Sequence, residues 1–479
     1  MCNLKKRPPH TMSNSNVESL PDAPDGGWGW MVVVGGFIVN GCAAGTFRSL
    51  GVLFLAFRQQ FDASSAETAW VTSIMMCVMY LLAPFATALA STTGFRPVIM
   101  LGGVLSATGY VISAFGTRVY HLYLAIGCLT GLGCALTVSP MMVTVGQYFS
   151  TRRAVANSLA VLGASIMSMT LPLLFQYLLD EYGLKGALLI LGGVMLQEVV
   201  AGALVRPLKR HRNESDSGLE MSPNDTSDNL LGSNTATETK SAAVVRFFKK
   251  LWTDMDFKLV KIRSVAFYLT SLFLLAFSLI VPPMYIVPRA RDLQIEDYRA
   301  ASLLTASSIA DVVGRLSVGA IPDTPHFTRL DQFGLSLCLL GLTNLLCPLA
   351  ITYPGLIVYA IAHGLFYGAF VPTSFTCLAE LVGPKRLPGA LGLYMLVQGF
   401  ASLTGPPFAG WLYDRTGSYE VAFLQAGVCF LLAGLLPFIL RFTKRKTEEG
   451  ADELEDDVDS VKSDRETATF LLITHETSL

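Results

Sequence analysis

Long stretches of apolar residues, separated by shorter polar connections, occur twelve times along the chain. Each is close to the roughly 20 residues that a helix needs to cross the hydrocarbon core of a bilayer. The first six lie near residues 30–56, 69–90, 98–115, 122–147, 155–178 and 184–205. The second six lie near residues 266–287, 300–320, 333–351, 356–381, 390–412 and 421–440. The pattern predicts an all-α membrane protein in which 12 transmembrane helices form two sets of six.

Composition supports a membrane protein and excludes several other classes. The 479 residues are 52% hydrophobic and 15% charged, with a mean hydropathy of +0.49, which is more apolar than soluble proteins are. The net charge of −1 argues against a nucleic-acid partner, because binding a polyanion needs a concentrated basic face. The nine cysteines include no CxxC pair and lie mostly in apolar stretches, so we expect them to act as small apolar residues.

Lysine and arginine in the short loops predict the orientation, because these residues are enriched on the cytoplasmic side of a membrane. The loop residues that fall on one common side are Arg96, Arg152, Arg153, Lys209, Arg210, Lys385, Arg386 and Lys444 to Lys446. On the opposite side, the loop with Arg289, Arg291 and Arg299 also carries three acidic residues. We therefore expect both termini in the cytoplasm and a first helix that serves as its own signal.

Two halves, one long loop and two tails make up the expected organisation. The boundaries are a cytoplasmic tail at 1–27, a six-helix half at 28–205, a loop at 206–263, a second half at 264–441 and a tail at 442–479. The loop includes the stretch ESDSGLEMSPNDTSDN, whose few apolar residues cannot offset the entropy of ordering, so we expect it to be disordered.

A weak internal repeat relates the halves. A shift of 234 residues superposes Pro172 on Pro406, Asp180 on Asp414, Gly183 on Gly417, Ala156 on Ala390 and Leu159 on Leu393. Together with the six-plus-six pattern, this order predicts duplicated halves around an axis along the membrane normal, with the substrate between them.

Two sequence motifs resemble those of a known family. The stretch PDGGWGW, which contains Asp25, Gly26, Trp28 and Trp30, precedes the first helix, and its tryptophans suit anchoring at the headgroup level. Between the fourth and fifth spans, residues 148–160 read YFSTRRAVANSLA. Both motifs resemble the monocarboxylate transporter family of the major facilitator superfamily. This resemblance implies a plasma-membrane carrier and places Arg153 and Asn157 on the substrate and proton pathway.

Arg48, late in the first span, occupies a position where many members of that family carry a lysine implicated in carboxylate and proton binding. An arginine can hold a carboxylate with two hydrogen bonds, but it does not release a proton, so the substitution preserves anion binding and argues against a lysine-like relay. The alternative is that the Arg48 side chain extends to the outer headgroups.

Asp311 and Arg315 are four residues apart in the eighth span and so share one helical face. Charges inside a membrane are costly and mark functional candidates. The pair matches the family's intramembrane aspartate and arginine, and the resemblance implies that Arg315 binds the substrate carboxylate while Asp311 takes the proton. A purely structural ion pair is the alternative.

Other polar residues in the spans carry weaker signals. By resemblance, Tyr367 replaces a phenylalanine that shapes the substrate cavity, and Val371 replaces a serine, so the substrate preference is open. His363 is interpreted as an interior histidine rather than a site residue. Glu198, in the sixth span, has no evident partner in the sequence, and we expect it to be protonated or to face a neighbouring helix.

These observations favour a carrier over an enzyme or a channel, because the sequence shows no catalytic motif, metal spacing, cofactor motif or pore filter. Proton-linked symport of a monocarboxylate is the favoured function. A proton-independent facilitative carrier of creatine or an amino acid is the alternative. The resemblance adds a single-span immunoglobulin-type glycoprotein as a partner, and the terminal Thr477, Ser478 and Leu479 resemble a PDZ ligand.

Overall fold

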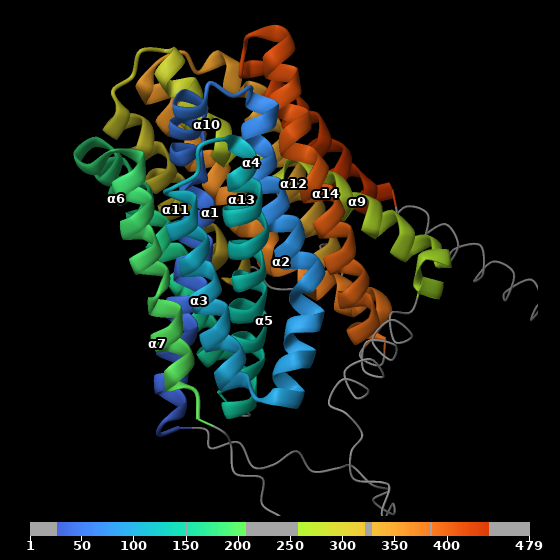
Figure 1. The fold of residues 1–479 in the computed structure, drawn as a ribbon. Coiled ribbons are helices and arrows are strands. Elements are labelled where there is room, and N and C mark those ends of the chain that lie inside the picture. The colour runs from blue at the N-terminus through green and yellow to red at the C-terminus, as the bar shows by residue number, and fades with distance from the viewer. Residues whose placement is uncertain (1–25, 150–151, 207–256, 321–327, 384–385, 440–479) are drawn as a thin grey trace, which may run out of the picture.

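The computed structural model describes residues 26–149, 152–206, 257–320, 328–383 and 386–439, and the regular structure in these ranges is helical (Figure 1). Asp25, most of the loop at 206–263 and the C-terminal residues Thr477, Ser478 and Leu479 lie outside the described ranges. The end of the bundle where α1 begins is called the base here, and the end where α1 finishes is called the top; they are the lower and upper ends in Figure 1.

The first half contains six spans. Its elements are α1 (Gly29–Phe61), α2 (Ser65–Thr93), α3 (Phe95–Ser113), α4 (Val119–Leu122), η1 (Tyr123–Thr130), α5 (Gly131–Tyr148), α6 (Arg153–Met195) and α7 (Gln197–Leu204). The α4, η1 and α5 elements form one continuous span, in which η1 is π-helical. Gly183 has a φ of 64°, which breaks α6 into the fifth span and the beginning of the sixth.

The second half repeats this arrangement. Its elements are η3 (Phe257–Lys261), α9 (Arg263–Leu279), α10 (Val281–Asp292), α11 (Asp297–Ala320), α12 (Arg329–Leu346), η4 (Cys347–Leu349), α13 (Tyr353–Val382) and α14 (Leu387–Thr416). A last helix runs over Glu420–Ile439. Gly417, which ends α14, has a φ of 70° and so shares a positive φ with Gly183, its counterpart in the repeat.

The prediction of twelve spans is confirmed. In the described residues, nine helices are long and apolar enough to cross a membrane. One of them, Val155–Leu204, holds two spans separated at Gly183, and α11 and α14 complete the twelve. The α11 helix falls short on composition because it carries Asp297, Arg299, Asp311 and Arg315.

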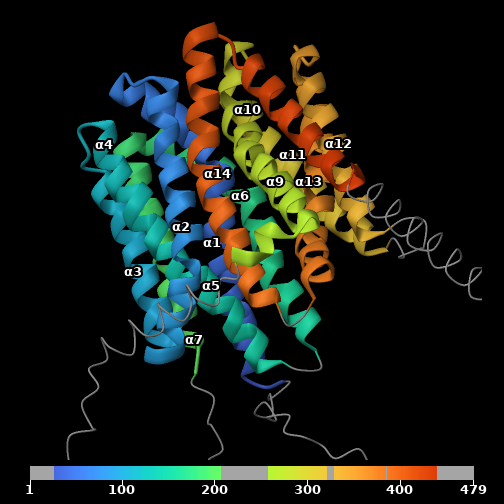
Figure 2. The same ribbon diagram turned by 90° about the vertical axis from the view of Figure 1, so that its right-hand side faces the viewer.

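The two halves contact each other through helices that are distant in sequence. The α2 and α14 helices lie side by side, as do α6 and α11 (Figure 2). Near the top, Phe54 of α1 packs edge-on against Tyr285 of α10, with ring centroids 5.2 Å apart. In the described residues, the hydrogen bonds that join the halves occur from the level of Arg48 upward, and none joins them at the base.

Within the first half, α1 and α6 approach so closely that one glycine has no room for a side chain. A Cβ added at Gly163 would overlap the carbonyl oxygen of Phe37. Close backbone approach at small residues is how membrane helices gain packing energy, since lipid is as apolar as the helices themselves. This contact packs the part of α1 that lies about three turns before Arg48 against α6.

We expect Gly163→Ala to destabilise the protein by roughly 1 to 3 kcal/mol, because one methyl group overpacks this crossing. Thermal unfolding in detergent micelles would measure the change. Gly193→Ala is the matched control, because a Cβ at exposed Gly193 meets no atom within 4 Å. Equal melting temperatures for the wild type and Gly163→Ala would contradict the prediction.

Candidate functional site

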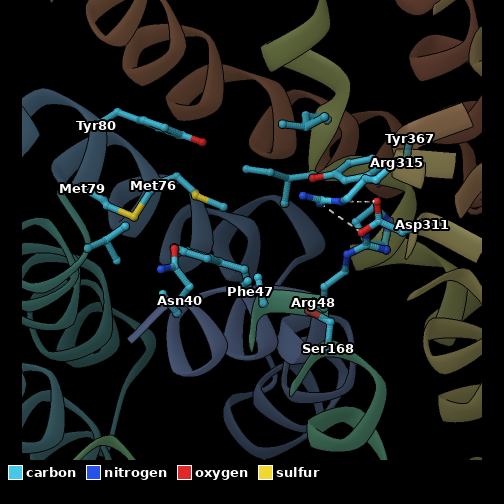
Figure 3. Close-up of a pocket in the computed structure, with 17 residues that line it drawn as sticks. Asn40, Phe47, Arg48, Met76, Met79, Tyr80, Ser168, Asp311, Arg315 and Tyr367 are labelled. Atoms are coloured by element: carbon cyan, nitrogen blue, oxygen red, sulfur yellow. Dashed lines mark hydrogen bonds and ion pairs between the residues drawn. The ribbon is translucent and has the colours of Figure 1, made fainter. Parts of the chain in front are cut away.

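A cavity of about 240 Å³ lies between the two halves at the middle of the bundle (Figure 3). One wall consists of apolar and weakly polar side chains from the first half, among them Phe47, Met76 and Met79. The other wall carries the charged residues of α11 together with Tyr367 of α13. The cavity therefore has an apolar side and a charged side, which suits a small molecule with both characters.

Asp311 is the centre of the charged wall. Arg315 donates two hydrogen bonds to it, from Nε to Oδ1 at 2.9 Å and from Nη2 to Oδ2 at 3.1 Å. Arg48, from the other half, donates from Nη2 to Oδ2 at 3.3 Å. The Asp311 and Arg48 side chains are only 4% and 9% exposed, and that of Arg315 is 26% exposed. Two guanidinium groups therefore share one carboxylate, and the three side chains carry one net positive charge when ionised.

The helices bring these side chains together for identifiable reasons. Asp311 and Arg315 lie one helical turn apart on α11 and face the same way. Gly368 lets α13 pack against this turn, since a Cβ there would come within 2.8 Å of Asp311 Oδ1. The close approach positions Tyr367, whose ring centroid lies 4.5 Å from Cζ of Arg48 in a cation–π contact. Arg48 also donates from Nη1 to Ser307 Oγ at 3.3 Å.

Four of the predicted pathway residues meet at this cavity, namely Arg48, Asp311, Arg315 and Tyr367 (Figure 3). The alternative that Arg48 extends to the headgroups is wrong, because its side chain turns inward to Asp311. Asn157 lies on α6 two turns before Ala164, the first α6 residue that lines the cavity, and its Oδ1 is buried without a partner in the described structure. Asn157 is not among the described residues that line the cavity. Arg153 is the first residue of α6. The side chain of Arg153 lies outside the described part of the structure.

The tryptophans of the N-terminal motif contact residues of other spans at the base of the first half. Trp28 Nε1 donates to the carbonyl oxygen of Leu204 at 2.8 Å, and the guanidinium of Arg206 lies 3.5 Å from the Trp28 ring centroid. Trp30 packs against Phe149, with ring centroids 5.1 Å apart. Gly26 begins this turn by accepting a hydrogen bond from the backbone of Gly29. The motif thus links the first span to the end of the sixth, which is a more specific role than headgroup anchoring.

Sequence reasoning missed Ser307 near the charged wall and Asn40 in the cavity, and it set His363 aside as an interior histidine. Ser307 binds Arg48, and His363 lies next to Ser307, 3.5 Å from its Oγ through Nδ1. Asn40 lines the opposite side of the cavity. The signal for Ser307 was its position one helical turn before Asp311, but small hydroxyl residues are frequent in this helix and the spacing alone did not select it.

Glu198 faces a helix neighbour, as one of the two expectations stated. Its side chain is fully buried, with its Cβ against Gly103 of α3. Neither carboxyl oxygen has a hydrogen-bond partner in the described structure. Glu198 lies in the interior of the first half and outside the cavity wall.

Polar contacts close the top of the bundle above the cavity. The carboxylate of Asp414, at the end of α14, accepts hydrogen bonds from the backbone of Ser65 and Ala66 at the start of α2, each at 2.9 Å. An acid at a helix N-terminus is favoured by the free amides and the helix dipole. Arg58 donates to the Tyr419 hydroxyl at 2.8 Å. Burial raises the pKa of Tyr419, so its hydroxyl is neutral in this contact.

Comparison with known proteins agrees with this architecture. A family model described as the Major Facilitator Superfamily matches residues 36–330 and 266–475. Solved structures of a peptide transporter POT with sulfate and of a POT family transporter with 5-aminolevulinic acid superpose with TM-scores of 0.66 and 0.65, at 14% and 13% identity. They cover 88% and 89% of this chain, and this chain covers 96% and 99% of theirs. At that identity the likeness shows the fold.

Sequence relatives are closer. Monocarboxylate transporter 2 of Mesocricetus auratus is 36% identical over 421 residues, which are 88% of this chain and 85% of that protein. The chain belongs to the monocarboxylate transporter family. Monocarboxylate transporter 1 of Bos taurus is 35% identical over 431 residues, or 87% and 85% of the two chains. This monocarboxylate transporter family member is therefore a multi-pass membrane carrier with the major facilitator fold, and it is not an enzyme.

Replacing Asp311 and replacing Arg48 should lower the free energy of unfolding by different amounts. Asp311→Asn leaves the buried guanidinium of Arg48 and the partly exposed one of Arg315 without a counter-charge in the cavity wall and should cost roughly 3 kcal/mol. Arg48→Gln leaves the Asp311–Arg315 pair intact and should cost about 1 kcal/mol. Thermal unfolding in detergent at neutral pH shows which of the two variants loses more stability. Glu296→Gln is the control, because its side chain is 76% exposed and its pairing with Arg299 contributes little. A larger loss for Arg48→Gln would contradict the shared-carboxylate arrangement.

Proposed function

We propose that this carrier transports small monocarboxylates together with a proton by alternating access. The observation that carries the proposal is the sharing of Asp311 between Arg48 and Arg315 in the wall of the central cavity. The net positive charge attracts one carboxylate, and each guanidinium can bind a carboxylate through two hydrogen bonds. The apolar wall with Phe47, Met76 and Met79 would take the short carbon chain of the substrate.

Protonation of Asp311 is the coupling step in this proposal. When Asp311 accepts a proton, it no longer competes for the two guanidinium groups, which then bind the substrate carboxylate. Conversely, a bound carboxylate draws the guanidinium groups away from Asp311 and makes its protonation more favourable. Each ligand therefore raises the affinity for the other by the same factor, as linkage requires. Arg48 contributes positive charge and orients the substrate. It does not carry the transported proton, because a guanidinium does not release its own proton.

The halves at 28–205 and 264–441 would rock about this cavity to expose it to each side in turn. We assign the base to the cytoplasm, because Arg96, Arg152, Arg206, Arg263 and Arg386 all lie at that end. The described residues show contacts between the halves from Arg48 upward and no hydrogen bond between them at the base, which then corresponds to an inward-facing state. By family likeness the membrane is the plasma membrane.

Other assignments follow from resemblance rather than from the cavity. A single-span immunoglobulin-type glycoprotein would accompany the carrier to the cell surface, and a PDZ protein would bind Thr477, Ser478 and Leu479. The second candidate function is facilitated transport of creatine or an amino acid without a proton. It is favoured by Arg48, which replaces a proton-releasing lysine, and by the Tyr367 hydroxyl, which adds a polar group to the cavity wall.

Transport into proteoliposomes tests the proposal. Purified protein is offered pyruvate, lactate, a ketone body or creatine while a trapped dye reports lumenal pH and labelled solute reports uptake. We expect a monocarboxylate to acidify the lumen, and we expect Asp311→Asn to reduce this flux by roughly 100-fold or more, because the proton acceptor is gone. Glu296→Gln should transport like the wild type. Solute entry without a pH change, and unaffected by Asp311→Asn, would replace symport with the facilitative alternative.

A further inference from the structure

A file of polar side chains leads from the charged wall toward the top of the second half. It begins at Arg48, which binds Ser307 on α11. Ser307 Oγ lies 3.5 Å from Nδ1 of His363 on α13. The His363 ring lies between those of Tyr367 and Tyr359 on the same face of α13, with centroids 6.0 and 5.8 Å away. All these side chains except Tyr367 are less than a tenth exposed.

The file continues to the surface through residues of four further elements. The Tyr359 hydroxyl donates to Asn344 Oδ1 at 2.9 Å on α12. One turn later along the chain, Cys347 Sγ lies 3.4 Å from Nη1 of Arg289 on α10. Arg289 Nη2 lies 3.7 Å from Glu420, whose side chain is 50% exposed at the top. A half-exposed carboxylate and the buried Asp311 thus mark the two ends of the file.

His363 differs from an ordinary interior histidine in one respect. Its side chain is 3% exposed, yet Nε2 has no hydrogen-bond partner in the described structure. A buried ring nitrogen without a protein partner is expensive unless an ordered water or a passing proton uses it. Helix packing also fixes the position of His363, because Gly364 lets α13 contact the backbone of Ser307 directly. The ring is therefore held beside Ser307 with one nitrogen free on the side away from it.

We propose that His363 relays the transported proton between the top of the bundle and Asp311. Nε2 accepts the incoming proton. A neutral imidazole can do this because only one of its two nitrogens carries a proton. Nδ1 then gives its own proton to Ser307 Oγ, and Ser307 passes its hydroxyl proton to Asp311. The imidazole and the hydroxyl each gain and lose one proton, and Asp311 gains one. The inference rests on the proposed proton-linked transport and names the residue that supplies the proton.

Ser307 and Asp311 lie one helical turn apart on α11 and both bind the guanidinium of Arg48, so in this proposal the last transfer takes place when Arg48 turns to the substrate. Arg48 Nη1 lies 3.3 Å from Ser307 Oγ, and Nη2 lies 3.3 Å from Asp311 Oδ2. The charged groups that face the His363 region are Arg48 on α1, Asp311 and Arg315 on α11, and Arg289 on α10. A substrate carboxylate on Arg48 would offset the positive charge near the ring and favour passage of the proton.

The experiment compares two fluxes in the same proteoliposomes. Pyruvate counterflow, with equal pH and equal pyruvate on both sides, needs the cavity but no net proton movement. Net pyruvate influx with lumenal acidification needs the proton to enter and leave. For His363→Gln we expect net influx to fall by roughly tenfold or more while counterflow changes by less than about twofold, since only proton transfer is lost. The rise of influx with external acidity should also flatten.

Controls and contrary outcomes separate this inference from the proposed function. His121→Gln, at a histidine outside the cavity wall, should match the wild type. Tyr359→Phe, which removes the next hydroxyl in the file, should slow net influx more than counterflow. Unchanged net influx in His363→Gln would overturn the relay while leaving proton-linked transport in place. An equal loss of both fluxes would make His363 a positioning residue for Arg48 and would also overturn it. Net pyruvate influx by the wild type without lumenal acidification would overturn both proposals.

Discussion

The carboxylate of Asp311, held between guanidinium groups from two different halves, is the interaction on which the rest of the site depends. In a site of low dielectric a single unpaired charge is costly, so three charges stay together only when each has a partner. The arrangement has one positive charge in excess, and in the proposed function an anionic substrate supplies the missing counter-charge. Binding of the substrate and rearrangement of the contact between the halves are therefore the same electrostatic event.

Duplication of the halves followed by divergence explains the two-sided cavity. By their order in the halves, α2 and α11 are counterparts, the second span of each. The α2 helix contributes Met76, Met79 and Tyr80 to the cavity wall, whereas α11 contributes Asp311 and Arg315. The second span of the first half thus offers an adaptable apolar surface and that of the second half two charges, while the third charge, Arg48, comes from α1 of the first half. Such a cavity matches molecules with a short apolar body and one charged end, and it orients them the same way each time.

Much of the fold and part of the site could be predicted from the sequence. Length and hydropathy give the spans, because a helix must satisfy its own backbone in lipid, and Gly183 and Gly417 share both the repeat and a positive φ. Asp311 and Arg315 were predictable because they are one turn apart in an apolar helix. Arg48 pairs with a residue 263 positions away, and no local pattern contains that contact. His363 and Ser307 required the α11–α13 crossing, which depends on the three-dimensional packing at Gly364 and Gly368.

The contacts at the top determine how readily the carrier can change state. Separate hydrogen bonds hold the top together, and each contributes on the order of 1 kcal/mol. Asp414 binds the start of α2, Arg58 binds Tyr419, and Arg291 binds Gln176. Water can replace them as they open, because they lie near the end of the bundle. The Arg48–Asp311 contact lies deeper, where water cannot compensate for its loss. In the proposed proton-linked cycle, the top would thus open at moderate cost once a proton and a carboxylate satisfy the buried charges, and this rearrangement of the charged wall would be the step that controls the cycle.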